Sequence, residues 1–304
     1  MKIVVIGAGA LGAYFGARWE EAGHDVTFYV RERRAAQLKE HGILLHSTQG
    51  DYEIKQPRVT TDITSIEKAD LVLLAVKGYH LSGTLDQLKH LTNKGAKVLP
   101  ILNGMEHISI LQKELGESAI MGGLSYIIAT LDDKGHVVHS SPFHDLVFGA
   151  LHQSQQAIAE ELALACSQAN MDGRQSPSIL EDLWSKYMFI NAFSGITTAT
   201  DLPIGAVREH PETFHLARMV LEEMKDLANK HGISLTDTHV DKAFGNLENF
   251  GYESTSSMHQ DRRKGLTLEV EHLHGGALRL GDAVGLAMPY TESIYGMIKP
   301  FERA

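Results

Sequence analysis

The chain opens with MKIVVIGAGALG, residues 1–12, and this stretch decides the fold. Residues 2–6 are continuously apolar, which is typical of a parallel strand covered on both faces. Glycines at positions 7, 9 and 12 follow, and residues 11–22 have helical periodicity. In such a strand, turn and helix, two glycines allow a tight turn and close approach of a pyrophosphate, and the third lets helix and strand pack. The stretch therefore predicts a dinucleotide site at Gly7, Ala8, Gly9, Ala10, Leu11 and Gly12.

The same alternation of strand and helix continues over the first half of the chain. Further parallel strands are predicted at 26–30, 71–76, 97–102 and 119–121, with helices at 34–41, 81–91 and 105–115. Short strands at 126–130, 136–139 and 146–148 predict an antiparallel extension of the sheet. Beyond Pro177 the periodicity is helical, at 180–200, 212–231, 237–247 and 269–284. The expected fold is α/β, with a Rossmann-type doubly wound sheet in residues 1–176 and an all-helical domain in residues 177–304.

Composition narrows the class of protein. A chain of 304 residues is long enough for two cores, and its net charge of -10 argues against nucleic acid or an anionic membrane as partner. Cys166 is the single cysteine and is expected to be a small core residue. The 17 histidines are scattered and include no HExxH pattern, so no metal is expected. With no apolar run of membrane-spanning length, we expect a cytoplasmic enzyme, compatible with a homodimer.

The end of the second strand predicts which dinucleotide is bound. An NAD enzyme places a carboxylate there for the ribose 2′-hydroxyl, whereas this strand runs into Arg31. A guanidinium pairs with a 2′-phosphate, so NADP is favoured, although Glu32 turned inward or a solvated loop would remove that preference. Lys77 and Asn103 follow the next two strands at the carboxyl edge of the sheet, where ligands bind. An Asn-Gly pair such as 103–104 is, taken alone, more often a turn.

With these residues assembled, the sequence resembles the ketopantoate reductase family. The matching motifs are GAGALG, Arg31, VKGYH, LNGM, LWSK, and SSMHQD followed by LEVE, in the family order over nearly the whole chain. The resemblance implies that Lys186 is the catalytic lysine, that Asn103 and Ser257 contact substrate, and that Glu269 contacts the reacting end of substrate or cofactor. It also implies a cofactor contact at Ala129. An ammonium at Lys186 would stabilise and protonate the developing alkoxide while the cofactor supplies hydride to a 2-oxo acid.

The helix that carries Lys186 departs from the family pattern. Better-known members have substrate-binding asparagines four and eight positions after the lysine, where this chain has Ile190 and Ser194. Asn191 is a candidate for the first contact, but a shift of one residue turns it roughly 140° away from Lys186 on a regular helix. Ser194 would keep one hydrogen bond. Three functions remain open: 2-dehydropantoate reductase, a reductase of another branched or aromatic 2-oxo acid giving a D-2-hydroxy acid, and a non-catalytic NADP sensor.

Overall fold

The computed structural model describes residues 1–302 of the chain, which form two compact units. The first unit holds Met1–Leu102 and His107–Ile179, and the second holds Asn103–Glu106 and the residues from Leu180 onward. The chain therefore passes between the units at Ile179, whereas the sequence placed the boundary after Ser176. The short segment Asn103–Glu106 belongs to the second unit although the first unit surrounds it in sequence.

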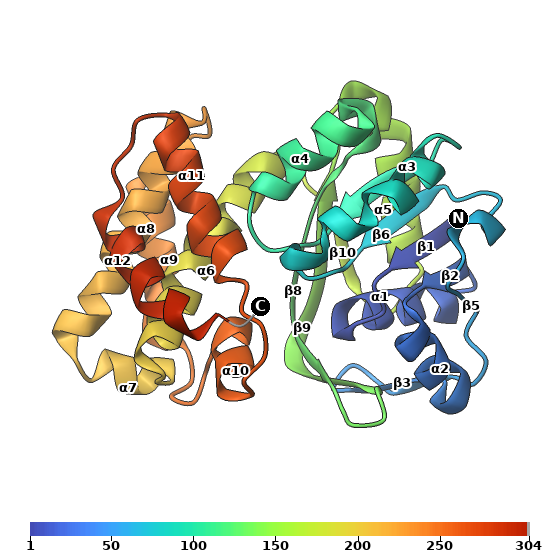
Figure 1. Ribbon diagram of the computed structural model, residues 1–304, viewed down its shortest axis with the longest axis horizontal. Helices are drawn as coiled ribbons and strands as arrows, with labels where there is room; N and C mark the ends of the chain where they lie inside the picture. The colour runs from blue at the N-terminus through green and yellow to red at the C-terminus, as the bar shows by residue number, and fades with distance from the viewer. Residues whose placement is uncertain (303–304) are drawn as a thin grey trace. The chain divides into compact units, whose positions relative to one another are not determined.

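The predicted doubly wound sheet is present in the first unit (Figure 1). Its order is β5-β2-β1-β6-β7 and all of its strands are parallel. The strands are β1 (Lys2–Ile6), β2 (Asp25–Tyr29), β5 (Val59–Thr60), β6 (Leu71–Leu74) and β7 (Lys97–Pro100). The helices of this unit are α1 (Ala10–Glu21), α2 (Glu32–His41), α3 (Leu85–Thr92), α4 (Glu106–Leu115, whose first residue lies in the second unit) and α5 (Gln156–Ser167).

The two faces of this sheet bury separate cores. Ile3 and Val5 of β1 point into a core shared with α1 and α5, while Val4 and Ile6 point into a core shared with α3 and α4. Side chains alternate between the faces of a strand, so a strand buried on both sides must be apolar throughout. Cys166 lies buried in the first of these cores, as expected.

A second sheet contains the predicted antiparallel strands and corrects their placement. The residues at 126–130, 136–139 and 146–148 do not extend the parallel sheet; they belong to the long antiparallel pair β8 (Gly122–Leu131) and β9 (Val137–Gly149). This pair joins β3 (Ile43–Ser47), β4 (Tyr52–Ile54) and β10 (Asp172–Gln175) in the order β10-β9-β3-β4, with β8 along β9. Residues 119–121 form no strand of their own: a 3-10 turn, Glu117–Ala119, leads into one isolated bridge between Ile120 and Val98.

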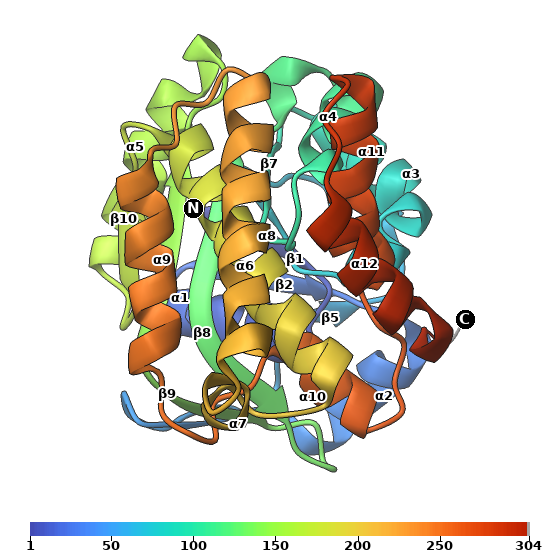
Figure 2. The same ribbon diagram turned by 90° about the vertical axis from the view of Figure 1, so that its left-hand side faces the viewer.

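The second unit is helical, as predicted (Figure 2). Its elements are α6 (Ile179–Thr200, whose first residue lies in the first unit), α7 (Ile204–Arg208), α8 (Pro211–Lys230), α9 (Asp237–Asn249), α10 (Ser257–Arg263), η6 (Glu271–Gly275), α11 (Gly276–Ala283) and α12 (Pro289–Ile298). Helix α8 packs against α9, α11 and α12. The predicted helix at 269–284 is interrupted, because η6 is a π-helical turn.

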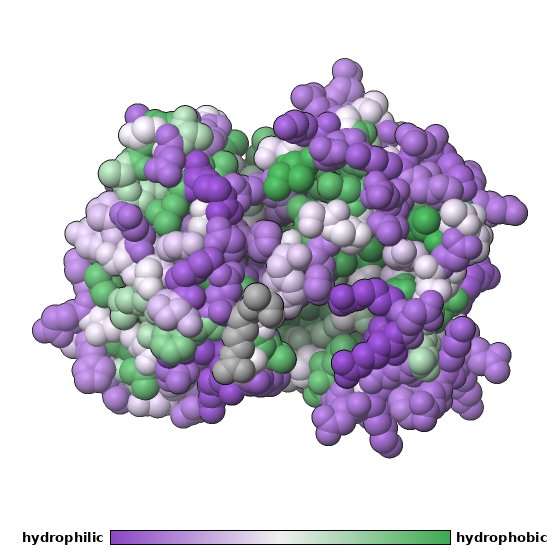
Figure 3. Space-filling model, in the orientation of Figure 1, coloured by the Kyte–Doolittle hydropathy of each residue, from purple (hydrophilic) through white to green (hydrophobic). Residues whose placement is uncertain are grey.

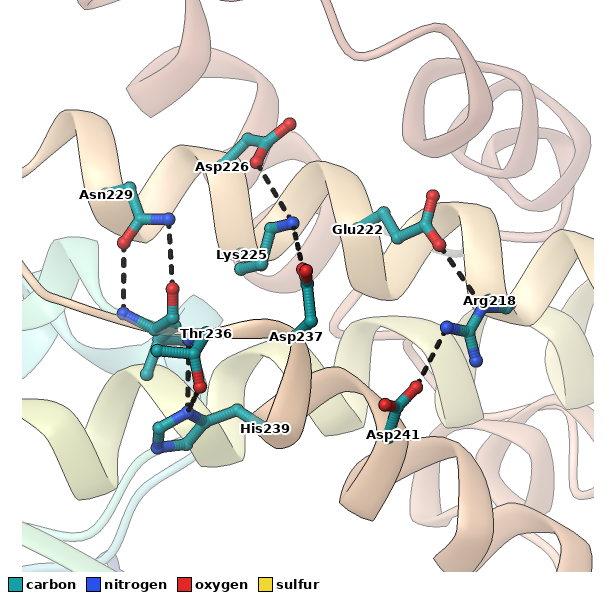
Figure 4. A network of polar contacts seen from close by, with 10 residues as sticks. Arg218, Glu222, Lys225, Asp226, Asn229, Thr236, Asp237, His239 and Asp241 are labelled. Carbon is teal, nitrogen blue, oxygen red and sulfur yellow. Dashed lines mark hydrogen bonds and ion pairs between the residues drawn. The ribbon is translucent and has the colours of Figure 1, made fainter.

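Polar contacts hold α8 to α9 and to the loop between them (Figure 4). Arg218 of α8 pairs with Asp241 of α9 at 2.8 Å, and Lys225 pairs with Asp237 at the start of α9 at the same distance. The Asn229 side chain donates to the carbonyl of Leu235 and accepts from its N–H, both at 3.0 Å. These contacts fix the α8–α9 hairpin at its open surface.

The face of the molecule drawn in Figure 3 is mostly polar, with apolar residues scattered among the polar ones. None of the helices within residues 1–302 combines the length and the apolar character that crossing a membrane requires.

Candidate active site

The three glycines of the first turn are required for different reasons. Gly7 has a φ of 95°, and a Cβ there would lie 2.8 Å from the Ala75 carbonyl oxygen. A Cβ at Gly12 would lie 2.1 Å from the Gly7 carbonyl oxygen, so this glycine allows α1 to pack on the turn. Gly9 has an ordinary φ of -71°, and a Cβ there would meet no atom of the chain within 4 Å. The space next to Gly9 therefore suits a group from outside the chain.

The N-terminus of α1 lies directly behind this turn. Gly9 is its N-cap and offers no side chain, and the first turn, which holds Ala10 and Leu11, contains no acidic residue. The first backbone N–H groups of a helix have no partner within the helix and lie at the positive end of its dipole. This end can accept the pyrophosphate of a dinucleotide.

A cavity of about 540 Å³ opens beside the turn, within the first unit. A volume of this order suits a nucleotide. Several predicted cofactor residues line it: Gly7, Ala8, Gly9, Arg31 and Lys77. Gly83, Thr84 and Gln87 also line it, which the sequence did not predict because no motif marks the short 3-10 turn Ser82–Thr84 and the start of α3.

Arg31 and Arg34 have different roles at this cavity. Arg31 is the exposed N-cap of α2, and its Nη2 lies 3.3 Å from Nε2 of His80 on the opposite wall. Burial and the nearby Arg31 lower the pKa of His80, so the imidazole is neutral near pH 7. The Arg34 guanidinium donates to the carbonyls of Ala8 and Gly135, at 2.8 and 3.0 Å, and thus braces the glycine turn.

Two other residues considered for the cofactor site, Glu32 and Ala129, do not line this cavity. Glu32 follows Arg31 as the first residue of α2 but does not line the cavity. Ala129 lies on β8 opposite His139 and is half-buried against the first core. Leu131, two residues further along β8, lines the cavity in its place. Nothing about the strand pattern distinguishes these two positions.

The second unit brings together the predicted catalytic pair. Lys186 lies in α6, and Glu269 immediately precedes the helix that begins at Val270. Glu269 is only 5% exposed. Burial lowers the pKa of Lys186 to about 8, and the Glu269 charge opposes this by raising it. The lysine is thus mostly an ammonium at pH 7 yet releases its proton far more readily than a solvated lysine.

The predicted substrate-binding residues of this unit differ in how exposed they are to solvent. Asn103 is half-buried, and Gly104 after it has a φ of 99°. Ser257 is exposed at the first position of α10, where the neighbouring Ser256 acts as the helix cap. Ser194 is 5% exposed.

Asn191 is fully buried on a regular stretch of α6, so the helix has no bulge that would turn it toward Lys186. Its side-chain nitrogen donates to the Tyr187 carbonyl at 3.0 Å. Asn191 therefore supports the helix itself, and we do not expect it to replace an asparagine at position 190.

An apolar wall continues the face of α6 that carries Lys186. Ile190 is four positions after Lys186 and thus about 40° from it around the helix. The Phe189 and Phe193 rings lie on either side of it in sequence and both contact the Phe250 ring, at centroid distances of 5.8 and 5.3 Å. These side chains are apolar around position 190, where better-known family members have an asparagine.

In the described part of the chain, no three His, Cys, Asp or Glu side chains gather as metal ligands. The strand, glycine turn and helix N-terminus of the first unit, with the cavity beside them, define a class of protein: a dinucleotide-binding protein of the Rossmann type.

Comparison with known proteins gives the family. The family model "Ketopantoate reductase PanE/ApbA" matches residues 3–153, and its C-terminal counterpart matches residues 178–302. The chain belongs to the ketopantoate reductase family of NAD(P)-dependent oxidoreductases.

Individual relatives cover the whole chain. The "Uncharacterized oxidoreductase YkpB" of Bacillus subtilis is 32% identical over 302 residues, 99% of each chain. The 2-dehydropantoate 2-reductase of Pyrococcus abyssi is 29% identical, over 98% of this chain and 97% of its own. The crystal structure of 2-dehydropantoate 2-reductase from Geobacter metallireducens matches with a TM-score of 0.91 at 26% identity, over 99% of both chains. A D-mandelate dehydrogenase solved with NADH and anilino(oxo)acetate has the same fold, with a TM-score of 0.89 at 24% identity over 99% of this chain and 98% of its own.

Proposed function

We propose that this protein reduces 2-dehydropantoate to D-pantoate with NADPH, a reaction that supplies pantoate for pantothenate and coenzyme A. The observation that carries the proposal is the half-buried Lys186, whose pKa desolvation lowers to about 8 while Glu269 favours its charged form. A lysine with this pKa serves as a proton donor near neutral pH, because general acids are most effective when their pKa lies near the working pH. A dinucleotide sensor would have no use for such a group.

The bound cofactor supplies a hydride to the carbonyl carbon. The Lys186 ammonium stabilises the negative charge that develops on the carbonyl oxygen and then gives it a proton. Carbon thus gains hydride, oxygen gains a proton, and the neutral amine takes a new proton from solvent. Glu269 accepts a hydrogen bond from the new hydroxyl and favours the charged form of the lysine before each turnover.

The substrate carboxylate needs hydrogen-bond donors. Asn103 and Ser257 are assigned to it, the first through its amide N–H₂ and the second through its hydroxyl. Ser194 offers a further hydroxyl on the lysine helix, although it is largely buried. Asn103 and Glu269 are also assigned to the nicotinamide end of the cofactor.

NADPH is proposed over NADH because Arg31, rather than a carboxylate, lines the cavity at the end of β2. Lys77 at the same cavity adds a second positive charge for the phosphates. The fold itself is neutral on this point, because the D-mandelate dehydrogenase with the same fold was solved with NADH.

A second candidate is the reduction of another branched or aromatic 2-oxo acid to a D-2-hydroxy acid. The apolar wall formed by Phe189, Ile190, Phe193 and Phe250 favours it. Ketopantoate carries a terminal hydroxyl that an apolar wall cannot hydrogen-bond. Both candidates share the reaction and the roles of Lys186 and Glu269.

The test is NADPH oxidation followed by absorbance with a panel of 2-oxo acids that includes ketopantoate, repeated with NADH. The highest kcat/KM with ketopantoate supports the first candidate, and the highest value with another branched or aromatic 2-oxo acid supports the second. NADPH binding without turnover of any 2-oxo acid would contradict both and leave the sensor. An Ile190→Asn variant sharpens the choice, since it should raise kcat/KM for ketopantoate relative to its deoxy analogue by about tenfold.

A further inference from the structure

The segment that follows Glu269 has an unusual backbone. Residues Glu271–Gly275 form a π-helical turn, the only such turn within residues 1–302, and α11 continues from it at Gly276. The backbone carbonyl of Glu269 accepts hydrogen bonds from the N–H groups of His272 and Leu273, at 3.1 and 2.9 Å, so the turn is joined directly to the backbone of the residue that carries the candidate catalytic carboxylate. A π-turn holds one extra residue compared with an α-turn and is frequently found at functional sites.

Two side-chain hydrogen bonds join this turn to the lysine helix. The Tyr187 hydroxyl, one residue after Lys186, donates to the Leu273 carbonyl at 2.6 Å. Nε2 of the buried His274 donates to the Asn191 carbonyl at 3.0 Å. Gly195 makes the second approach possible, because a Cβ there would lie 2.6 Å from Nε2 of His274. Burial lowers the pKa of His274 to about 4, so this imidazole is neutral under working conditions.

The same turn also holds the Asn103 segment. A Cβ at Gly104 would lie 2.9 Å from the His272 carbonyl oxygen, so glycine is needed for the approach. Arg279 of α11 donates from Nε and Nη2 to the two carboxylate oxygens of Glu106, at 2.9 and 2.7 Å. It also pairs with the Glu271 carboxylate and donates to the Glu271 carbonyl at 2.9 Å.

The geometry points to a positioning role: we propose that the π-turn Glu271–Gly275 fixes Asn103, Lys186 and Glu269 relative to one another, with Tyr187, His274 and Arg279 as its positioning residues. This inference rests on the proposed function, because it assigns these residues to the same reaction. The extra residue is what makes the arrangement possible. Removing it would turn the following residues by about 100°, so the Leu273 carbonyl and the His274 ring could not both face α6.

A purely structural role for the same contacts predicts a different result. A contact that only stabilises the unit lowers the free energy of unfolding and leaves the chemistry unchanged. A contact that positions Glu269 against Lys186 changes the pKa of that lysine, because Glu269 is the charge that raises it. It also lowers kcat, since a displacement of about 1 Å in a catalytic group reduces turnover up to a hundredfold.

The decisive variant is Tyr187→Phe, which removes the hydroxyl and keeps the ring. The matched control is Tyr290→Phe, on the half-exposed start of α12. Two readouts are compared: the pH profile of kcat for the best 2-oxo acid, and the pH dependence of Lys186 acylation measured by mass spectrometry. We expect kcat to fall about tenfold or more in Tyr187→Phe and the Lys186 midpoint to move below its wild-type value. Tyr290→Phe should match the wild type in all of these.

If Tyr187→Phe does not fold, Arg279→Lys serves in its place, because Arg279 is exposed and lysine keeps the charge while losing the two-point contact with Glu106. A lower melting temperature with unchanged kcat and an unchanged Lys186 midpoint would overturn the positioning role. The acylation readout needs no turnover. If the wild type reduces no 2-oxo acid, the proposed function fails, while the shift in the Lys186 midpoint still tests the π-turn by itself.

Discussion

The pH dependence of turnover gives the most direct test of Lys186 as the proton donor. Burial lowers the pKa of its ammonium from 10.5 to about 8, against the opposing effect of Glu269. The reaction needs the protonated form, so activity is present below this pKa and is lost as pH rises through it. At pH 7 about ten ammonium forms exist for each neutral amine, and at pH 9 the ratio is reversed, so kcat should fall about tenfold between the two.

The assay is NADPH oxidation at saturating concentrations of both NADPH and the best 2-oxo acid, from pH 6 to pH 10. Saturation ensures that the profile reports the bound complex rather than substrate binding. The Lys186→Ala variant should lose most of its turnover while keeping its affinity for NADPH, since the amine acts mainly in the transition state. Lys242→Ala, on the exposed side of α9, is the matched control and should retain full activity.

A second variant separates the effect of Glu269 on the pKa of Lys186 from the effect of burial. Glu269→Gln removes the attraction that raises the pKa of Lys186 and leaves its burial in place, so the alkaline limb should move to lower pH by about one unit. Glu248→Gln on α9 changes an exposed carboxylate and should leave the limb unchanged. A wild-type kcat that stays flat to pH 9.5, or a limb in Glu269→Gln at the wild-type position, would refute the reasoning.

Three further predictions concern the first unit. Arg31→Ala should weaken NADPH by about tenfold or more and NADH far less, as measured by titration of each; equal losses would rule out pairing with a 2′-phosphate. Gly12→Ala should lower the free energy of unfolding, measured in urea, by about 2 kcal/mol or more, because its Cβ would overlap the Gly7 carbonyl oxygen. Gly9→Ala should change the free energy of unfolding by less than about 0.5 kcal/mol and still abolish NADPH binding. Buried Cys166, whose pKa burial raises to about 12, should resist a thiol reagent at pH 8 until urea unfolds the protein; labelling of the native protein would show that its core opens.

Local signals explain how much of the fold the sequence predicts. The strand Lys2–Ile6 is predicted to the residue, since an apolar run before a glycine turn and a helix has one simple interpretation. Strand β10 (Asp172–Gln175) reads DGRQ and has no apolar residue, so only its pairing with β9 makes it a strand. The three-residue strand β4 cannot be predicted from the sequence either, because it is a strand only through its pairing with β3.

The candidate site divides in the same way. Arg31 is predictable because its role depends on the end of one strand, and it does line the cavity. The desolvation of the half-buried Lys186 depends on elements far away in sequence, and nothing in the residues around it indicates a lowered pKa. The π-turn is hidden for another reason: its sequence EHLHG does not interrupt the apolar spacing of a helix, and only the structure, with the contacts of Leu273 and His274 to α6, reveals the turn.

The proposed site separates the residues assigned to the reaction from those that would select the substrate, and this explains why family membership leaves the substrate open. In the proposed mechanism Lys186 and Glu269 act on the 2-oxo group, which every candidate substrate carries, so they would not distinguish between substrates. In this proposal, discrimination comes mainly from Ile190 and the phenylalanines beside it. A site that hydrogen-bonds a substrate hydroxyl rejects the analogue without it by about 10⁴-fold, whereas an apolar pocket rejects an added hydroxyl by only about a hundredfold. With isoleucine in place of asparagine, this chain has given up the stronger kind of selection at that position. The substrate panel should therefore show a graded preference across branched 2-oxo acids, and an almost absolute preference for ketopantoate would mean that another polar group recognises its hydroxyl.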